Sequence, residues 1–391
     1  MKSLAHSFFN KWSLKKLFLH FDVVLFSISL YSSILSGPLG FTENASAYFA
    51  IASFSFFILG MPLRRLRINY AFPVKMLMCV AFLWFFWIFA DPVNAYGVEK
   101  RLYYIIYFVA FFIYFPFLIY NEERLEIFIF SVFSLGLLVA LFLSFGGRVT
   151  SADRTVVGES NPIWVARSIG WSVLILPFLG MRTYLKIFIA IFMIWSMLLT
   201  GSRGPVVALL AVMVFHACAS FRGSVKYKYI SFSFVAVITL VLLPSVLPEW
   251  VTSRFSDLVG DSSDASTSVR FFFIQKSIEL MAENPLDGGG LGYFLLQVGV
   301  RYPHNQFLEI GVELGALFLM LFILFVFYSS IKFYRFYLFL GRDYQIVALL
   351  FFYSLLNSLM SGDILSPKIM YLTSGLLFYR FNALWNRNKI G

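Results

Sequence analysis

Residues 304–328, HNQFLEIGVELGALFLMLFILFVFY, decide the class of fold. From Ala316 to Tyr328 the stretch carries no charge, and its two carboxylates, Glu309 and Glu313, lie near its beginning. A helix needs about 20 mostly apolar residues to cross the hydrocarbon core of a bilayer, which is ~30 Å thick. The stretch is therefore predicted to form a membrane-spanning helix.

Similar apolar runs recur along the whole chain. Hydrophobic residues make up 60% of the 391 residues and charged residues only 13%, whereas soluble domains are roughly half apolar and a quarter charged. We therefore expect an all-α integral membrane protein, a single polytopic membrane domain over residues 1–391, with about 12 transmembrane helices. The expected spans are residues 17–36, 45–62, 73–90, 102–120, 127–145, 163–181, 185–200, 205–221, 229–247, 304–328, 344–361 and 368–384.

The basic residues set the expected orientation. The N-terminus, MKSLAHSFFNKWSLKK, is basic, and no small-residue cleavage site follows the first apolar run, so span 17–36 is expected to be retained. Positive residues gather on the cytoplasmic side of membrane proteins. This rule puts both termini in the cytoplasm, and it accounts for much of the net charge of +11 without a nucleic acid as partner.

One group of basic residues runs against this rule on the expected outer side. It consists of Arg148, Arg154, Arg167, Arg203, Arg254, Arg270, Lys276 and Arg301. The longest outer loop, residues 248–303, precedes the tenth span, and a structureless loop of that length is uncommon. Within it, SVRFFFIQKSIELMAENP (residues 268–285) has apolar residues at helical spacing with charges between them. We expect an amphipathic helix at the membrane face that ends at Asn284 and Pro285.

The sequence TGSRGP, residues 200–205, joins the seventh and eighth spans. Pro205 suits the first turn of a helix, so Arg203 is expected at a helix N-terminus. Free backbone N–H groups, the positive end of the helix dipole and a guanidinium group all favour an anion such as phosphate there. The alternative is a short turn whose arginine reaches lipid headgroups.

The sequence NPLDGGGLGYF, residues 284–294, is rich in glycine. Gly288, Gly289, Gly290 and Gly292 allow backbone conformations that other residues avoid, so the chain can approach a ligand closely there. The cluster lacks the GK[ST] of a phosphate-binding P-loop and follows no predicted strand, which excludes a nucleotide site of that kind. The alternative is a flexible turn.

His304 lies at the expected outer mouth of a span, beside an arginine-bearing loop. An unperturbed histidine pKa of about 6.5 suits general-base or hydrogen-bonding work on a hydroxyl group. Asn305, Glu309 and Glu313 follow at i, i+4 spacing and share a helical face that we expect to look inward. The alternatives are a structural histidine, and carboxylates that only pair with arginines to hold helices together.

The remaining acidic residues and the cysteines point to no metal site. Asp22 and Asp363, at membrane depth or its edge, are expected to form structural pairs. Cys79 and Cys218 have no partner at a metal-ligand spacing, and no two acidic residues on the expected outer face have one. We expect metal-independent chemistry without a cofactor.

These motifs resemble the O-antigen ligase and polymerase superfamily of bacterial surface-polysaccharide assembly. The resemblance rests on TGSRGP, on the pattern from Arg270 to Phe294, and on HNQFLEIGVELGALFL from His304 onward. With the long loop before span ten and the basic loop that contains Arg154, it covers most of residues 146–330. It implies a multi-pass protein of the bacterial inner membrane whose active site faces the periplasm.

The resemblance also implies the chemistry. Glycans carried on undecaprenyl pyrophosphate are the donors; an acceptor hydroxyl attacks the anomeric carbon, and undecaprenyl pyrophosphate leaves. The implied catalytic residues are His304, Arg203 and Arg270: the two arginines stabilise the pyrophosphate, and His304 activates or orients the acceptor. Arg154, Arg301, Asn305, Tyr302, Gly290 and Glu313 are the implied substrate-binding residues. The implied partners are the undecaprenyl-pyrophosphate-linked oligosaccharide, membrane lipids and a polysaccharide chain-length regulator.

Three functions follow from these expectations. A polymerase joins O-antigen or capsular repeats, whereas a ligase transfers the glycan to lipid A core. The two activities share these motifs, and we favour the polymerase because polymerases are the more numerous members. A transporter or flippase of lipid-linked glycans would need charges deep in both halves of the chain, but the charges crowd the expected outer face.

Overall fold

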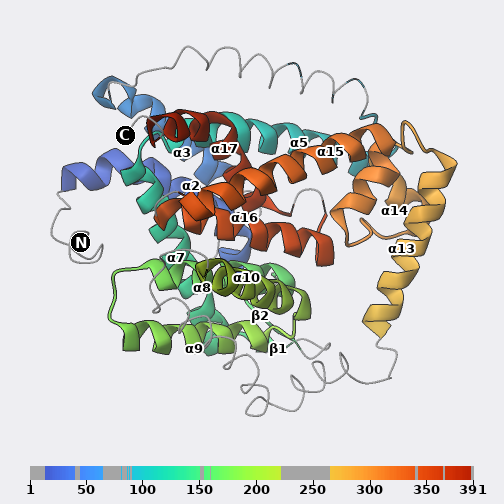
Figure 1. Cartoon of the computed structure of the whole chain (residues 1–391). Coiled ribbons are helices and arrows are strands. Elements are labelled where there is room, and N and C mark those ends of the chain that lie inside the picture. The colour runs from blue at the N-terminus through green and yellow to red at the C-terminus, as the bar shows by residue number, and fades with distance from the viewer. Residues whose placement is uncertain are drawn as a thin grey trace. The chain divides into compact units, whose positions relative to one another are not determined.

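The computed structural model describes residues 14–39, 45–64, 81, 86, 88, 90–149, 154–158, 160–221, 265–339, 342–363 and 366–388. Nearly all of the described elements are helices (Figure 1). The exception is a short antiparallel pair of strands, β1 (Arg148–Val149) and β2 (Thr155–Val156). This agrees with the predicted all-α class.

Most described helices begin and end near the predicted spans, but α5 begins seven residues before the predicted start at 102 and α15 ends eleven residues after the predicted end at 328. Their bounds are α2 Leu14–Leu39, α3 Ala45–Arg64, α5 Ala95–Phe108, α6 Phe115–Leu118, α7 Glu122–Gly146, α8 Pro162–Ile175, α9 Thr183–Leu199, α10 Arg203–Phe221, α13 Ala265–Glu283, α14 Tyr293–Val298, α15 Gln306–Phe339, α16 Arg342–Ser361 and α17 Lys368–Asn388. A π-helical turn, η1 (Val109–Tyr114), joins α5 to α6, and a 3-10 turn, η2 (Leu176–Phe178), follows α8. Predicted span 229–247 and most of span 73–90 lie outside the described residues, so the total of about 12 stays a prediction.

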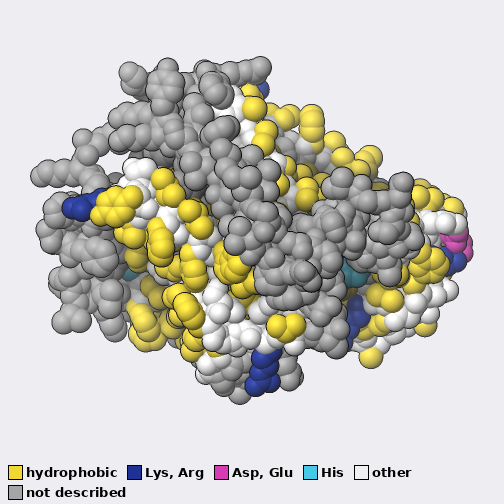
Figure 2. Space-filling model, turned by 90° about the horizontal axis from the view of Figure 1, so that it is seen from below, with side chains coloured by type: hydrophobic (Ala, Val, Ile, Leu, Met, Phe, Trp, Pro, Cys, Tyr) yellow, Lys and Arg dark blue, Asp and Glu magenta, His cyan; other side chains and the backbone are white. Residues whose placement is uncertain are grey.

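Four described helical segments are long and apolar enough to cross a membrane: Ala95–Leu118, Glu122–Gly146, Gln306–Phe339 and Arg342–Ser361. Six shorter apolar helices accompany them. Large apolar side chains are exposed on several helices, such as Phe145 at 82% and Phe188 at 70%. Figure 2 shows one face on which yellow apolar side chains predominate among the described residues and lysines or arginines occur in a few separate places. This surface suits a hydrocarbon solvent.

The chain contacts divide into two compact units. The first comprises Met1–Leu66, Leu118–Asp261 and Leu340–Tyr353, and the second Arg67–Phe117, Ser262–Phe339 and Ser354–Gly391. In the first unit, Gly136 lets α7 approach α8, because a Cβ atom there would lie 2.0 Å from the Ser172 hydroxyl oxygen. Small residues permit such close approach between membrane helices.

An ion pair is buried in the first unit. The Arg124 guanidinium contacts the Asp22 carboxylate at 2.7 Å, and neither side chain is exposed. An unpaired charge at membrane depth is costly. The predicted structural pairing of Asp22 is therefore confirmed, with α7 supplying the partner for α2.

The second unit holds the long helix α15 together with α5, α13, α14 and α17 (Figure 1). Helix α15 contains one residue with non-helical backbone angles, Gly315, at φ 76° and ψ −177°. These angles are essentially restricted to glycine. The predicted span 304–328 thus consists of a short first segment that ends at Leu314 and a long apolar second segment.

Candidate functional site

A helix, α13, is present where residues 268–285 predicted one, and its position at the membrane face stays a prediction. The helix runs from Ala265 to Glu283, and the chain turns at Asn284. Phe273, Ser277 and Leu280 are buried along one face, while Phe271 on another face is 68% exposed. The buried face packs against Phe294 and Val312 in one hydrophobic cluster. The exposed face also carries Phe272, Ile274 and Ile278.

The charged residues of α13 pair locally. Lys276 donates a hydrogen bond of 2.9 Å to Glu279, one turn further along. This bond raises the pKa of the Lys276 ammonium group and lowers the pKa of the Glu279 carboxyl group. Burial raises the pKa of the Tyr293 hydroxyl group, and so does its hydrogen bond to Glu283. These contacts lie on the exposed side of α13 and at the start of α14.

The glycine-rich segment 288–292 is bonded to the protein itself. The Gly289 amide donates to the Val312 carbonyl at 2.8 Å, and the Gly290 amide donates to the Glu313 carbonyl at 3.0 Å. Gly288 and Gly290 have φ values of +71° and +88°. A Cβ atom at Gly290 would lie 2.7 Å from the Asp91 carbonyl oxygen. The glycines therefore allow this segment to approach a partner closely, and in this structure the partner is the backbone of α15 and of the chain before α5.

The break at Gly315 explains how α15 can accept these bonds. In a regular helix, the Val312 carbonyl would accept a hydrogen bond from the amide of Ala316. Here the Ala316 amide instead donates to the Pro285 carbonyl at 2.9 Å, which leaves the Val312 carbonyl for Gly289. The segment before α14 thus replaces part of the helical bonding of α15.

The start of α5 holds the same segment from its other side. Leu291 forms a parallel bridge with Pro92, with bonds from the Leu291 amide to Asp91 at 2.8 Å and from the Val93 amide to Leu291 at 3.0 Å. The Asn94 side chain caps α5 by accepting from the Gly97 amide at 2.8 Å, and it donates to the Gly292 carbonyl at 2.9 Å. The first turn of α5 is therefore tied to the glycine-rich segment.

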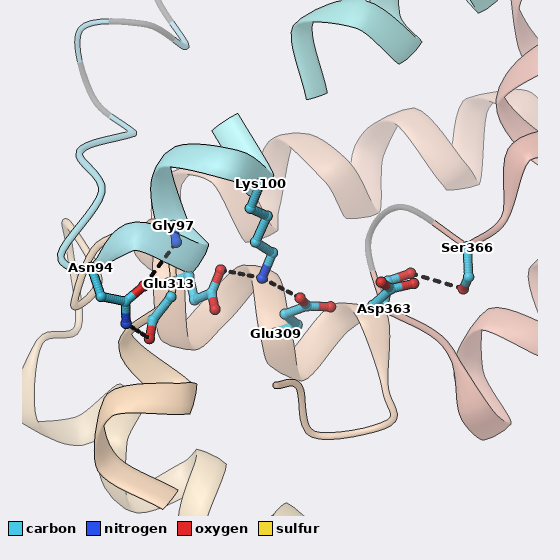
Figure 3. Close-up of polar contacts among 8 residues, drawn as sticks. Asn94, Gly97, Lys100, Glu309, Glu313, Asp363 and Ser366 are labelled. Carbon is cyan, nitrogen blue, oxygen red and sulfur yellow. Dashed lines mark hydrogen bonds and ion pairs between the residues drawn. The ribbon is translucent and has the colours of Figure 1, made fainter. Parts of the chain in front are cut away.

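One turn further along α5, the ammonium group of Lys100 bridges two carboxylates of α15 (Figure 3). It bonds Glu309, and it contacts Glu313 at 2.5 Å. All three side chains are buried, with Lys100 at 0% exposure. The sequence suggested arginines as the partners of these carboxylates, whereas the partner in the structure is a lysine.

His304 lies between the glycine-rich segment and α15, in an unusual backbone conformation. It is the one non-glycine residue with positive φ in the described part of the chain, at 61°. Its ring stacks on Phe273 with a centroid distance of 5.9 Å and meets the edge of Tyr302 at 4.7 Å. Its carbonyl accepts a bond of 3.3 Å from the Gly362 amide. These contacts fix both the ring and the backbone of a half-buried histidine.

The neighbours of His304 include most of the predicted site residues of the second unit. Arg270 lies on α13 one turn before Phe273, whose ring contacts His304. Arg301 is exposed, and its guanidinium lies 5.8 Å from the centre of the Tyr96 ring. Asn305 accepts from the Phe307 amide at 2.9 Å and donates to the Leu359 carbonyl at 3.0 Å. Arg301, Tyr302, His304 and Asn305 thus form one short stretch beside α13.

Gly290 and Glu313, two predicted substrate-binding residues, have internal partners in the same unit. The Gly290 amide bonds the Glu313 backbone, and the Glu313 side chain bonds Lys100. Both residues therefore belong to the bonded scaffold of the second unit. Their direct contact with a substrate stays a prediction.

Arg203 and Arg154 belong to the first unit. Arg203 is the first residue of α10 and is half-buried, as expected from TGSRGP. Gly201 has a φ of +62°, and the Ser202 amide donates to the Thr200 hydroxyl at 3.1 Å, which shapes the turn from α9. Arg154 directly precedes β2. The predicted helix start at Arg203 is therefore confirmed, and anion binding there stays a prediction.

Sequence reasoning missed Asn94, Tyr96 and Lys100. The predicted span began at residue 102, whereas α5 begins at Ala95, so all three seemed to precede the membrane helix. The available signal for the earlier start was Asn94 itself, because asparagine is a preferred N-cap residue; in the structure it caps α5 through the Gly97 amide. Within the described residues, no group of three His, Cys, Asp or Glu side chains is arranged to hold a metal ion.

Comparison with protein families relates part of the chain to a known family. Residues 188–341 match a family model described as O-antigen ligase. The matched range contains TGSRGP, the glycine-rich segment and the stretch from Arg301 to Asn305, which are the motifs that carried the resemblance. No curated protein matches the chain. The family match confirms the predicted relationship to the O-antigen ligase and polymerase superfamily.

Proposed function

We propose that this chain, a multi-pass membrane protein of the O-antigen ligase and polymerase superfamily, polymerises O-antigen or capsular repeat units. The donors are repeats linked to undecaprenyl pyrophosphate, and the acceptor is another lipid-linked repeat. One observation carries the proposal: His304, in a constrained conformation, lies beside Tyr302 and against the helix that bears Arg270, within the range that matches the family.

The proposed reaction is a displacement at the anomeric carbon. A bond forms between that carbon and an acceptor hydroxyl oxygen, and the bond to the phosphate oxygen of the donor breaks. His304 accepts the hydroxyl proton or orients the hydroxyl group, and undecaprenyl pyrophosphate departs with its electron pair. Because the leaving group is already activated, the protein acts chiefly by stabilising charge and positioning the acceptor.

The arginines supply the charge stabilisation. We assign the departing pyrophosphate to Arg270 and Arg203, with Arg154 and Arg301 as supporting cations. The start of α10 suits this role, because Arg203 stands where free helical amides and the dipole both favour an anion. No metal or cofactor is part of the proposed reaction.

Tyr302 and Asn305 flank His304 in sequence and are proposed to contact the glycan. Gly290 and Glu313 contribute to binding through the scaffold, because each is bonded within the protein. We place the site on the periplasmic side of the bacterial inner membrane, with both termini in the cytoplasm. The exposed apolar face of α13, with Phe271 and Ile278, then rests on the membrane surface.

A ligase is the second candidate, and the printed description of the matching family, O-antigen ligase, favours it. The ligase would use the same donor and leaving group but a sugar of the lipid A core as acceptor. The described site has the same groups for either acceptor. Only the product separates the two functions.

The test is a gel of surface polysaccharide from a strain that lacks the gene. It is complemented with wild type, Arg203→Ala, Arg270→Ala or His304→Ala at matched protein levels, and with Arg182→Ala as a control. Arg182 directly precedes α9 on the expected cytoplasmic side and donates to the nearby Tyr184 hydroxyl. The polymerase predicts a core that bears a single repeat in the deletion strain, and a ladder restored by wild type and by Arg182→Ala.

Two other results would decide against the polymerase. Bare core, with polymer accumulating on undecaprenyl pyrophosphate, would assign the ligase. A normal ladder in the deletion strain would exclude both. In the variants of Arg203, Arg270 or His304, loss of a single charge-stabilising donor is expected to lower the rate on the order of 10²-fold.

A further inference from the structure

We infer that Lys100 is a positioning residue: by bridging Glu309 and Glu313 it fixes the first segment of α15 and, with it, the stretch that carries His304. The inference rests on the proposed function for its effect on catalysis. Its structural part stands on the contacts of the second unit alone. Lys100 itself is not proposed to touch the substrate.

The first step is the position of the two carboxylates. Glu309 and Glu313 are one helical turn apart on α15, and the single ammonium group of Lys100 bonds both (Figure 3). All three side chains are within 1% of full burial. A charged group without a partner is strongly disfavoured in such a site. The bridge therefore holds one turn of α15 in a fixed position against α5.

The second step is the weakness of the first segment of α15 on its own. Gly315 interrupts the helical backbone directly after Leu314. The segment from Gln306 to Leu314 is shorter than a helix that is stable alone, which needs ~12 residues or more. Its position must come from contacts outside itself, and Lys100 makes two of them.

The third step links Lys100 to the glycine-rich segment. Asn94 caps α5 and Lys100 lies within it, six residues further along the chain; Asn94 bonds the Gly292 carbonyl while Lys100 bonds Glu313. The Glu313 carbonyl in turn accepts from the Gly290 amide. Helix α5 thus holds both the segment before α14 and the start of α15.

The consequence concerns the stretch between these two anchors. Residues 293–305, including Arg301 and Tyr302, begin at the glycine-rich segment and end at α15. His304 is five residues before Glu309 along the chain. If the bridge is removed, the end of the stretch that carries His304 loses one of the anchors that hold it in position. Misplacement of a reacting group by about 1 Å can cost on the order of 10²-fold in rate.

The test uses a charge-balanced variant, because Lys100→Met alone would leave two buried carboxylates and fail to fold. The variant Lys100→Met/Glu309→Gln/Glu313→Gln removes the bridge without leaving a buried charge. The matched control is Lys276→Met/Glu279→Gln on α13 with Glu122→Gln on α7, which makes the same change in net charge among mostly exposed residues. Both variants and wild type are compared as full-length purified protein in lipid nanodiscs.

Two measurements are made on each protein. Amide hydrogen exchange follows the Gly289, Gly290 and Leu291 amides, whose acceptors are backbone carbonyls of α15 and of the chain before α5. We expect faster exchange in peptides that cover residues 288–305 of the Lys100 variant, but not of the control. Turnover of lipid-linked repeats is expected to show kcat lowered about 10²-fold with KM little changed.

A folded Lys100 variant with wild-type exchange over residues 288–305 would overturn the inference. So would changed exchange with wild-type kcat, because the bridge would then stabilise the segment without positioning His304. If wild type itself makes no polymer, the turnover arm is run with a lipid A core acceptor. The exchange result still decides the structural part, so failure of the proposed function is distinguished from failure of the inference.

Discussion

The ring of His304 stacks on the ring of Phe273, with centroids 5.9 Å apart and planes inclined by 25°. Phe273 also meets Phe294 edge-on at 5.9 Å, so one buried aromatic side chain joins α13, α14 and the candidate catalytic histidine. Rings at such distances attract beyond their burial. The orientation of His304 therefore depends on how α13 is packed.

Phe273→Leu tests this dependence. Leucine keeps an apolar side chain in the core but removes the ring on which His304 stacks, so we expect a stability loss of less than about 1.5 kcal/mol. We expect the rate of glycan transfer to fall by about tenfold or more, since the imidazole is no longer held in one orientation. Turnover of lipid-linked repeats by purified protein is the measurement. Phe271→Leu on the exposed face of α13 is the control; equal rates for the two variants would contradict the prediction.

His304→Asn distinguishes the role of the backbone conformation at this position from the role of the imidazole ring. The φ of 61° suits asparagine better than most residues, so the variant should fold with stability within about 1 kcal/mol of wild type. Loss of the imidazole should lower the transfer rate on the order of 10²-fold or more. His304→Val is the complementary variant, because a β-branched residue is strained at this φ and should reduce thermal stability. An active asparagine variant would mean that the conformation, and not the ring, is what the site requires.

Gly315→Ala should be strongly destabilising. Its φ of 76° and ψ of −177° are essentially open only to glycine, and a Cβ atom would lie 2.0 Å from the Leu286 carbonyl oxygen. We expect a loss of about 3 kcal/mol or more from strain and displaced backbone together. The amount of folded protein after detergent extraction is the measurement.

Gly299→Ala is the matched control for this prediction. Gly299 has nearly the same φ, 75°, but no atom lies within 4 Å of the position of a Cβ atom. Only the conformational cost remains, which is about 1 kcal/mol. Equal losses at both positions would show that the close approach to Leu286 contributes nothing.

The pair Lys276 and Glu279 should make a contribution to stability that depends on pH. The pKa of Glu279 is lowered from its usual 4.5, so its contribution is present above pH 4.5 and is lost as the pH falls through the lowered pKa. The pKa of Lys276 is raised from 10.5, so its contribution is present below pH 10.5 and is lost as the pH rises through the raised pKa. Thermal unfolding of wild type and Glu279→Gln should differ slightly at neutral pH and converge in acid. Curves that stay parallel into acid would contradict this assignment.

Local signals in the sequence were sufficient to predict several elements. The apolar spacing of residues 268–285, followed by Asn-Pro, predicted α13 and its end. The proline of TGSRGP predicted the start of α10 at Arg203. In each case the determining interactions lie within a few residues along the chain, so spacing and turn chemistry contain the required information.

The bridge at Lys100 could not be predicted in this way. Its partners, Glu309 and Glu313, are 209 and 213 residues away in the sequence. A hydropathy profile places the end of a span at a lysine such as Lys100. Burial of Lys100 becomes favourable only because α15, which is distant in sequence, supplies two carboxylates. The partners of the glycine-rich segment were equally unpredictable from the sequence. A cluster of glycines permits close approach either to a ligand or to another part of the chain, and only the structure shows that the partner is the chain's own backbone.

The break at Gly315 has a consequence for a protein in a bilayer. At ~1.5 Å per residue, the uncharged part of the second segment, from Ala316 to Ile331, spans only about 24 Å, which is less than a hydrocarbon core of ~30 Å. The crossing therefore continues into the first segment, on the other side of Gly315. This brings Glu309 and Glu313 into the membrane, where each carboxylate needs the partner that Lys100 provides.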